Sequence, residues 1–194
     1  MTIFRTGVSA QIAFAFFCMA FGIFGPFASL VDHVSGTVSG PYTHPLTAAS
    51  ILFGAYFILF YENGLGPLGR TYAPAMFFAF AVQRLLEINV PAWPPVIGNV
   101  AAVAGLDALG LHGAVSYQSA LMIIAMSCFQ LSLGRNWFVA FASLTALVLL
   151  VSLFWLIDQV FPSETTQLSV FSLAGFTLCT LGLLELHKQY PGRS

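Results

Sequence analysis

The chain has 194 residues, of which 58% are hydrophobic, 15% aromatic and only 7% charged, and its mean hydropathy is +0.88. A water-soluble domain carries about 25% charged residues, so this composition excludes an ordinary soluble fold. Six Lys and Arg against seven Asp and Glu leave a formal net charge of −1. No basic patch could therefore neutralise the phosphates of a nucleic acid, and we expect an integral membrane protein whose main partner is the lipid bilayer.

Six apolar runs follow one another along the chain, each close to the ~20 residues that a bilayer-crossing helix needs. They occupy residues 9–31, 45–61, 73–90, 115–134, 137–157 and 167–186. The runs are continuous, without the alternation of a membrane β-barrel, and so favour helices. We expect an all-α polytopic fold in which a single transmembrane domain, residues 1–194, contains three αα-hairpins at about 9–61, 73–134 and 137–186.

A shorter apolar run at 96–106 follows the proline-rich segment PAWPP. About a dozen residues are too few for a crossing, so this run predicts a re-entrant or surface-lying helix inside an outer loop at 91–114. Six crossings also separate the charges. The basic residues of the loops and ends fall on one side: Arg5, Arg70, Arg135, Lys188 and Arg193. The acidic residues fall on the other: Asp32, Glu87, Asp107, Asp158 and Glu164. Since Lys and Arg favour cytoplasmic loops, we expect both termini in the cytoplasm.

The three hairpins share a pattern at their outer ends. The first run of each pair leads to an aspartate, and a hydroxyl residue follows 15, 12 or 14 positions later: Asp32 with Thr47, Asp107 with Ser119, and Asp158 with Ser172. We interpret this as a threefold internal repeat in which the hydroxyl residues cap the second helix of each hairpin. Short loops in any polytopic protein could produce similar spacing, and that alternative stays open.

Three segments carry a family resemblance. They read THPLTAASILFGAYFILFYENG, GLDALGLHGAVSYQSALMIIAMSCFQLSLGR and LIDQVFPSETTQLSVFSLAGFTLCTLGLLELHKQYPG. Together they resemble the six-helix sensor modules that precede histidine kinase, diguanylate cyclase or phosphatase domains in bacteria, and they cover roughly residues 20–190. The resemblance implies a signalling input module in the bacterial inner membrane. PAWPP departs from the pattern, and no output domain lies within the 194 residues, so a free-standing relative, an excised input domain and a different kind of protein all remain open.

Arg84 is the most unusual residue of the apolar runs, because charges at that depth are costly and usually functional. Glu87 lies three residues further on the same helical face, and Gln83 is adjacent. We expect these three residues to bind a ligand or to act as a conformational switch. A structural Arg84–Glu87 pair, or an arginine that reaches the outer surface, is the alternative.

Other candidate sites are weaker. His33, His44 and His112 lie in outer loops beside acidic residues and could bind a transition metal or sense pH, although solvated loop histidines are the simpler interpretation. Small residues predict close helix contacts at Gly54, Ala125, Ala174, Gly175 and Gly182. The three cysteines lie in apolar runs, where we expect unpaired thiols that behave as small hydrophobes. Catalytic and cofactor motifs are not recognisable in the sequence, so we expect neither an enzyme nor a cofactor.

These observations favour three functions. The first is a sensory input module that binds a periplasmic or lipid-phase signal, hydrophobic or small, and transmits it through the last helix, 167–186, as a homo-oligomer or with a signalling partner. The second is an accessory subunit of a larger membrane complex. The third is a small-solute transporter or channel subunit, for which few buried polar groups are available.

Overall fold

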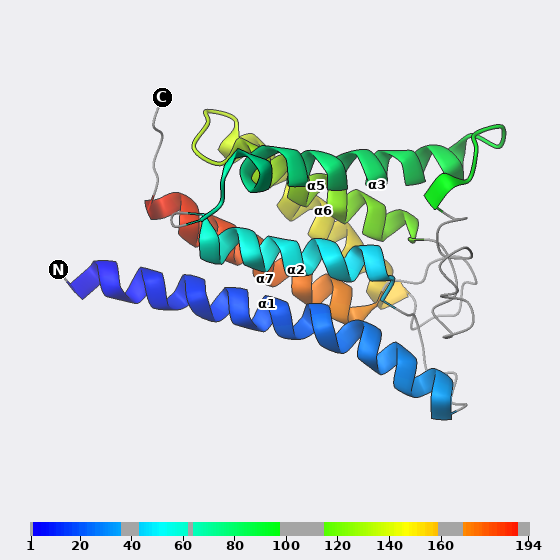
Figure 1. Ribbon diagram of the computed structural model, residues 1–194, viewed down its shortest axis with the longest axis horizontal. Helices are drawn as coiled ribbons and strands as arrows, with labels where there is room; N and C mark the ends of the chain where they lie inside the picture. Colours follow the sequence, from blue (N-terminus) through cyan, green and yellow to red (C-terminus); the bar gives the residue numbers. More distant parts are fainter. Residues whose placement is uncertain (1, 36–42, 62–63, 98–114, 159–168, 190–194) are drawn as a thin grey trace.

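The protein is built from helices. The computed structural model describes residues 2–35, 43–61, 64–97, 115–158 and 169–189. Within them the chain forms no strand (Figure 1), and its elements are α1 (Thr2–Ser35), α2 (Pro45–Phe60), the π-helical turn η1 (Leu68–Tyr72), α3 (Ala73–Asn89), α5 (Tyr117–Ser132), α6 (Phe138–Asp158) and α7 (Val170–Gln189). Each predicted run coincides with one α-helix, which confirms the all-α fold. Of the short helix predicted at 96–106, only Val96 and Ile97 are described.

Two of these helices are long and apolar enough to cross a membrane. They are α1, through its segment Ala10–Ala28, and α7. Two shorter apolar segments are Pro45–Phe60 in α2 and Phe138–Phe154, the part of α6 whose side chains are described. A helix of 16 residues, the length of α2 and of α5, spans about 24 Å, less than the ~30 Å hydrocarbon layer. Six helices were expected to be long and apolar enough to cross the bilayer, and two of them meet both criteria. The six-crossing topology is therefore a proposal.

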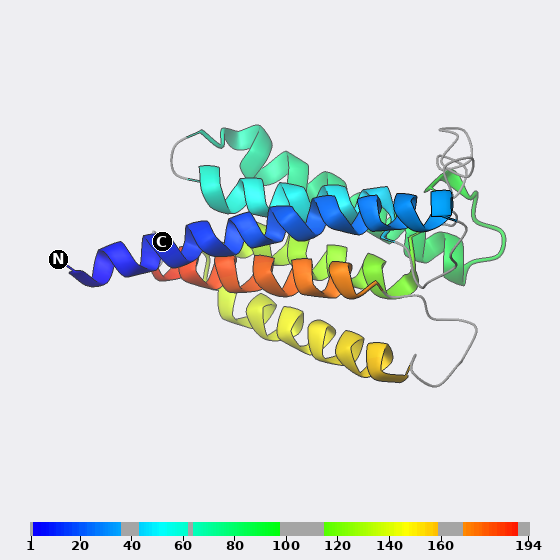
Figure 2. The same ribbon diagram turned by 90° about the horizontal axis from the view of Figure 1, so that it is seen from below.

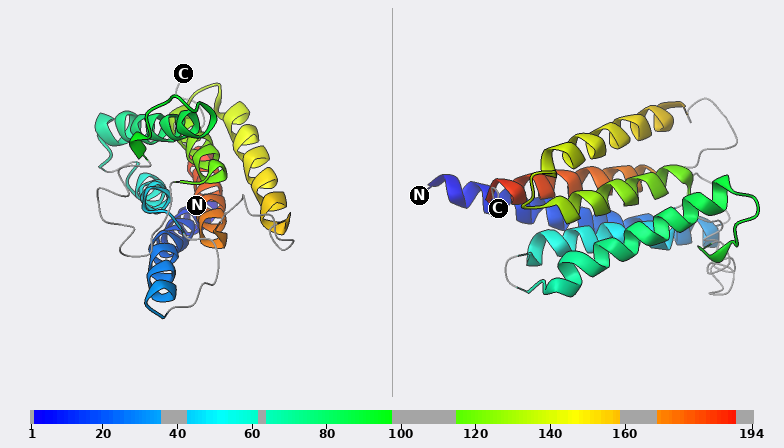
Figure 3. Two further views of the ribbon diagram at one scale, coloured as in Figure 1. Left: turned by 90° about the vertical axis from the view of Figure 1, so that its right-hand side faces the viewer. Right: turned by 90° about the horizontal axis from the view of Figure 1, so that it is seen from above.

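The helices pack as three hairpins around a common centre. α1 packs on α2, α3 on α5 and α6 on α7. Viewed along the bundle, α2, α5 and α7 lie toward the centre and α1, α3 and α6 around them (Figure 3, left). α1 also packs along α7 (Figure 2) and α6 along α5, while the rings of Phe77 in α3 and Phe53 in α2 lie 5.5 Å apart. Each peripheral helix thus contacts the central helix of its own hairpin and that of a neighbour, α3 reaching its neighbour α2 through the Phe77–Phe53 ring pair.

Glycines bring α2 and α7 close together. A β-carbon at Gly175 would lie 2.9 Å from the Cδ1 of Ile51, and one at Gly182 would lie 2.6 Å from the Cδ1 of Ile58. The two isoleucines and the two glycines are each seven residues apart, which places each pair on one face of its helix over two turns. A β-carbon at Gly54 would likewise meet the Sγ of Cys179 at 2.7 Å. The prediction of close contacts at Gly54, Gly175 and Gly182 is confirmed.

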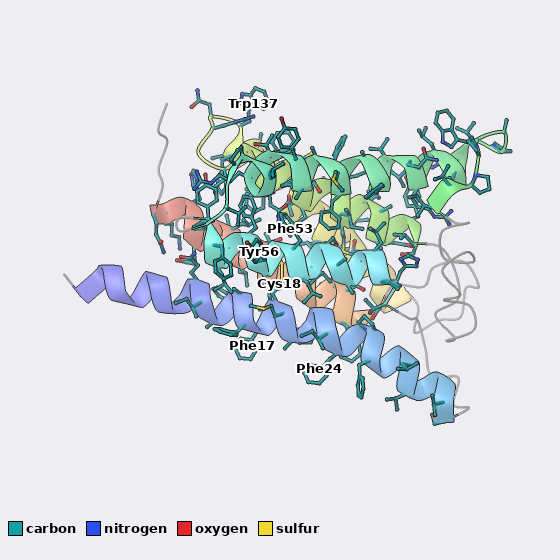
Figure 4. The ribbon with its side chains drawn as sticks, viewed as in Figure 1. Phe17, Cys18, Phe24, Phe53, Tyr56 and Trp137 are labelled. Atoms are coloured by element: carbon teal, nitrogen blue, oxygen red, sulfur yellow. A yellow bond between two sulfur atoms is a disulfide. The ribbon has the colours of Figure 1, made fainter. Side chains whose placement is uncertain are left out.

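One expectation about the cysteines is wrong. Cys18 of α1, labelled in Figure 4, forms a disulfide with Cys179 of α7, and their Cα atoms are 6.1 Å apart, a separation that suits such a bond. Both residues are fully buried, whereas Cys128 is free. The partners are 161 residues apart in sequence. Only the packing of α1 along α7 brings them together, so their local spacing gave no sign of the pairing.

The bundle has two distinct ends. We name as the inner end the one at which α1 begins and α7 ends, and as the outer end the one at which α2, α5 and α7 begin (Figure 1). Arg70 lies in η1 between α2 and α3, and Arg135 in the turn between α5 and α6. Both connections are at the inner end, as is Lys188 in the last turn of α7. Arg70, Arg135 and Lys188 therefore lie at one end of the described bundle, whereas Arg84 lies toward the other end.

Candidate functional site at the outer end

The three polar residues predicted near the outer end of α3 lie together. An Arg84 Nη1 donates to Glu87 Oε2 at 3.0 Å, and the side chains of Arg84 and Glu87 are 18% and 1% exposed. Gln83 Nε2 donates to Glu87 Oε1 at 3.2 Å. The nearly complete burial of the Glu87 side chain is tolerable only because the carboxylate has such partners. The Arg84–Glu87 pair considered in the sequence is thus formed.

Gln83 and Glu87 also hold the segment that follows α3. The backbone N–H of Ile97 donates to Glu87 Oε1 at 2.6 Å, and Gln83 Nε2 donates to the carbonyl of Pro94 at 3.3 Å. The indole Nε1 of Trp93 donates to Gln83 Oε1 at 3.0 Å. These bonds fold PAWPP back onto α3. Gln83 and Glu87 therefore mainly position the segment that follows α3. Arg84, the third residue of the group, also makes a contact outside that segment.

Arg84 reaches from α3 to the start of α5. Its Nε donates to the backbone carbonyl of Val115 at 2.9 Å, two residues before α5 begins. With Nη1 on Glu87, the guanidinium uses two of its five N–H donors in these bonds, and its Nη2 makes no hydrogen bond to the described residues. Arg84 therefore connects two elements of the second hairpin and keeps one side of its guanidinium group open.

His44 caps α2, and this role determines which nitrogen of its ring carries the proton. It precedes Pro45, the first residue of the helix, and its Nδ1 accepts from the backbone N–H of Leu46 at 3.1 Å. An accepting Nδ1 carries no proton, so in the neutral ring the proton is on Nε2. Nε2 is buried and has no partner in the described part of the chain. Burial and the positive charge of Arg84 lower the pKa of His44 from 6.5 to about 4, so the ring stays neutral at physiological pH.

This tautomer bears on the metal and pH interpretations of His44. A metal at Nε2 would require the proton to move to Nδ1, where it would oppose the N–H of Leu46. A residue with a pKa of about 4 also does not change charge between pH 5 and 8. The described residues contain no group of three metal-ligating side chains. The side chain of His33 and all of His112 lie outside the described residues.

The predicted repeat has a structural counterpart at the starts of the central helices. His44, Ser116 and Ser169 directly precede α2, α5 and α7, and each is three residues before one of the hydroxyl residues Thr47, Ser119 and Ser172. Ser116 Oγ accepts from the N–H of Ser119 at 3.2 Å. The capping side chains in α2 and α5 are thus His44 and Ser116, and the expectation that Thr47 and Ser119 are the caps is wrong by one turn.

The hydroxyl residues of the first and third hairpins make different contacts. Thr43 Oγ1 donates to Ser169 Oγ at 2.7 Å, and Ser172 Oγ donates to Thr43 Oγ1 at 3.4 Å, which joins the starts of α2 and α7. Thr47 is fully buried and its Oγ1 has no partner in the described part of the chain. Of the three predicted aspartates, Asp107 lies outside the described residues, and the side chains of Asp32 and Asp158 are not described.

Two site features escaped the sequence interpretation. The capping role of His44 was hidden because histidine is an uncommon cap, although its position directly before Pro45 was a usable signal. Gln130 of α5 is 4% exposed, and its Nε2 has no partner among the described residues and lies 3.7 Å from a β-carbon position at Gly54 of α2. The glutamine could have been noticed as an amide within an apolar run, although it lies in the last turn of α5.

Comparison with known proteins returns no match. No family model, no curated protein and no solved structure matches this chain.

Proposed function

We propose that this chain is a membrane-embedded sensory or regulatory input module of the bacterial inner membrane, with both termini in the cytoplasm. A periplasmic or lipid-phase signal binds at the outer end, and α7 carries the response to the inner end. The module acts as a homo-oligomer or with a signalling partner. The proposal joins the resemblance described above to the arrangement of α7 and of the outer-end polar residues.

Placement in the bilayer is supported by the surface of the peripheral helices. Large apolar side chains on α1 point away from the bundle (Figure 4), with Phe17 60% and Phe24 57% exposed. On α6, Val139 is 70% and Phe154 63% exposed. Exposed apolar surface of this extent is unfavourable in water and favourable against lipid. The basic residues at the inner end agree with a cytoplasmic location for that end.

The observation that carries the sensory proposal is the position of α7. Its start is hydrogen-bonded to the residue before His44 through the Thr43–Ser169 contact, and its end lies at the basic inner end. Between them α1 and α2 pack along it, with Ile51 and Ile58 against Gly175 and Gly182. A change at the start of α2 is therefore mechanically connected to the inner end through one helix, which is the element a two-state input module needs.

A photo-crosslinker placed at Lys188, which is exposed in the last turn of α7, tests this proposal in living cells. The expected product is a crosslink to a protein with a kinase, cyclase or phosphatase domain. A matched crosslinker at Phe24 on the exposed face of α1 is the control for lateral contacts. Crosslinks at Phe24 to subunits of a respiratory or similar complex, with none to a signalling protein at Lys188, would contradict the sensory proposal and favour an accessory subunit.

Gln130 favours a second candidate function, a small-solute transporter or channel subunit. Its amide nitrogen is buried and without a partner among the central helices, and buried polar groups between helices are typical of permeation pathways. Purified protein in liposomes should then conduct a small solute or ion, and Gln130→Leu should abolish that flux. Absence of flux for ions and common small solutes would remove this candidate.

A further inference from the structure

An exposed apolar segment begins in the last residues of α3 and projects beyond the helix at the outer end of the bundle (Figure 1). It has the sequence INVPAWPPV, residues 88–96, and we name it the outer apolar segment. All of its residues are exposed, Trp93 by 40% and Val96 by 51%, and none carries a charge. It continues the exposed apolar surface of α3, to which Met76 and Phe80 belong. A contiguous apolar patch of this kind marks contact with a membrane or with another protein.

The hydrogen-bond donors of the outer apolar segment are satisfied almost entirely within the protein. Its three prolines have no N–H, and the N–H groups of Val90, Trp93 and Val96 donate to backbone carbonyls at 2.8 to 2.9 Å. The indole Nε1 of Trp93 donates to a side chain of α3 at 3.0 Å, and the Asn89 amide donates to a carbonyl of α3 at 2.7 Å. Within the segment, only the N–H of Ala92 has no acceptor among the described residues. The segment therefore offers almost no donor to an outside partner.

This pattern fits lipid better than it fits water or a protein. Near the acyl chains little water is available, so backbone polar groups must find their partners within the protein. A loop in water needs no such arrangement, and a protein interface would use free polar groups for about one hydrogen bond per 100–200 Å². Tryptophan is enriched at the boundary between acyl chains and head groups. At that boundary the N–H of Ala92 would face the head groups and the water beyond them.

We infer that the outer apolar segment inserts into the outer leaflet of the bilayer, with Trp93 and Val96 at the boundary between acyl chains and head groups. This partner deepens the proposed function and rests on its membrane placement. Since the segment carries no charge, its partner is the apolar interior edge of the leaflet and not an anionic head group.

The same contact gives a lipid-phase signal a route into the bundle. Glu87 joins the segment to the rest of the candidate site, because its Oε1 accepts from the N–H of Ile97 and its Oε2 accepts from Arg84. Arg84 in turn donates to the carbonyl of Val115, just before α5. The leaflet is therefore connected through two side chains to the start of a central helix.

The test uses the full chain in phosphatidylcholine nanodiscs, with Trp137→Phe/Trp155→Phe so that Trp93 is the only tryptophan. Its fluorescence is measured in lipid brominated near the top of the acyl chains, in lipid brominated near the chain ends, and with iodide in the surrounding water. We expect the strongest quenching from bromine near the top of the chains and weak quenching by iodide. Addition of anionic phosphatidylglycerol should not change this order, because the segment has no charge.

Val96 provides a variant that weakens insertion without disturbing the fold. Its side chain is exposed, so Val96→Asp should leave thermal unfolding in detergent unchanged. A carboxylate below the head groups is strongly disfavoured, and quenching of Trp93 by the upper bromines, relative to unbrominated lipid, should fall by about half or more. Asn136→Asp is the matched control, because it places the same charge in an exposed turn at the inner end and should leave the quenching unchanged. If Val96→Asp does not fold, the measurement on Trp93 itself decides the outcome.

Several results would overturn the inference. Iodide quenching equal to that of free N-acetyltryptophanamide would place Trp93 in water. Quenching by neither bromine nor iodide would show that protein covers it, and strongest quenching from the chain ends would place it too deep. Equal quenching in Val96→Asp and Asn136→Asp would also contradict insertion. A chain whose two ends face opposite sides of the membrane, but whose Trp93 is open to iodide, would keep the proposed membrane placement and lose this contact.

Discussion

Arg84 holds the backbone carbonyl of Val115 at 2.9 Å from its Nε while its Nη1 pairs with Glu87. One guanidinium thus fixes the start of α5 against the end of α3. Its planar, forked donors allow both bonds at once, and the single ammonium of lysine cannot reproduce that geometry.

Arg84→Lys should therefore destabilise the protein although the charge is kept. Losing the bond to Val115 leaves a carbonyl without its donor and costs about 1–3 kcal/mol. The measurement is thermal unfolding in detergent, followed by tryptophan fluorescence. Arg135→Lys is the matched control, because Arg135 is exposed in the turn between α5 and α6 and its midpoint should not move. Equal midpoints for the two variants would refute the role assigned to Arg84.

Gly182→Ala should destabilise the α2–α7 contact, because the new β-carbon would lie 2.6 Å from Ile58 Cδ1. Overpacking of this kind costs about 1–3 kcal/mol and exceeds the ~1 kcal/mol that alanine gains over glycine in a helix. Ile58→Val removes Cδ1, so Gly182→Ala/Ile58→Val should recover most of the lost stability. Gly66→Ala, where a β-carbon meets nothing within 4 Å, is the control. A double variant no more stable than Gly182→Ala would contradict the contact.

Stability should depend on pH through His44. Its pKa is lowered to about 4 in the folded protein from 6.5, so the unfolded chain binds the proton more strongly. The contribution of the neutral ring is complete above pH ~6.5 and is lost as the pH falls toward 4. The protein should therefore unfold at lower temperature at pH 4.5 than at pH 7. His44→Asn, which caps without titrating in this range, should reduce that difference, and an unchanged pH profile in the variant would show that His44 is not responsible.

Alkylation reports the cysteine pairing. Under denaturing, non-reducing conditions a maleimide–polyethylene glycol reagent should add once, at Cys128, because Cys18 and Cys179 are joined. After reduction it should add at all three cysteines. The two states are resolved by gel mobility. Three additions without a reductant, in protein purified without one, would contradict the disulfide.

The sequence predicted the helices well because their apolar runs are continuous and bounded by strong signals. Pro45 starts both the predicted run and α2 itself, and Ala73 starts both the third run and α3. Gly54, Gly175 and Gly182 also indicated close contacts in advance, because small residues in apolar helices let neighbouring helices approach closely. These features depend on neighbouring residues alone.

The features that the sequence did not predict depend on residues that are distant in the chain. The Cys18–Cys179 bond requires the packing of α1 along α7, and the bond from Arg84 to Val115 requires the register of α3 against α5. His44 was read as a loop histidine because its proton position is set by the N–H of Leu46, a detail of local geometry. The spacing suggested caps at Thr47 and Ser119, whereas the capping residues lie three positions earlier in each helix. The spacing could not distinguish them, because a cap and the residue three positions after it repeat at the same interval.

The most direct test is to measure which side of the membrane each end of the bundle faces. Single cysteines replace Ala92, exposed in the segment after α3, and Asn136, exposed in the turn between α5 and α6, in a Cys128→Ser background. In intact bacterial cells a membrane-impermeant maleimide should label A92C and should label N136C only after the inner membrane is permeabilised. Labelling of both positions in intact cells would contradict the transmembrane arrangement, and labelling of N136C alone would show that it is inverted.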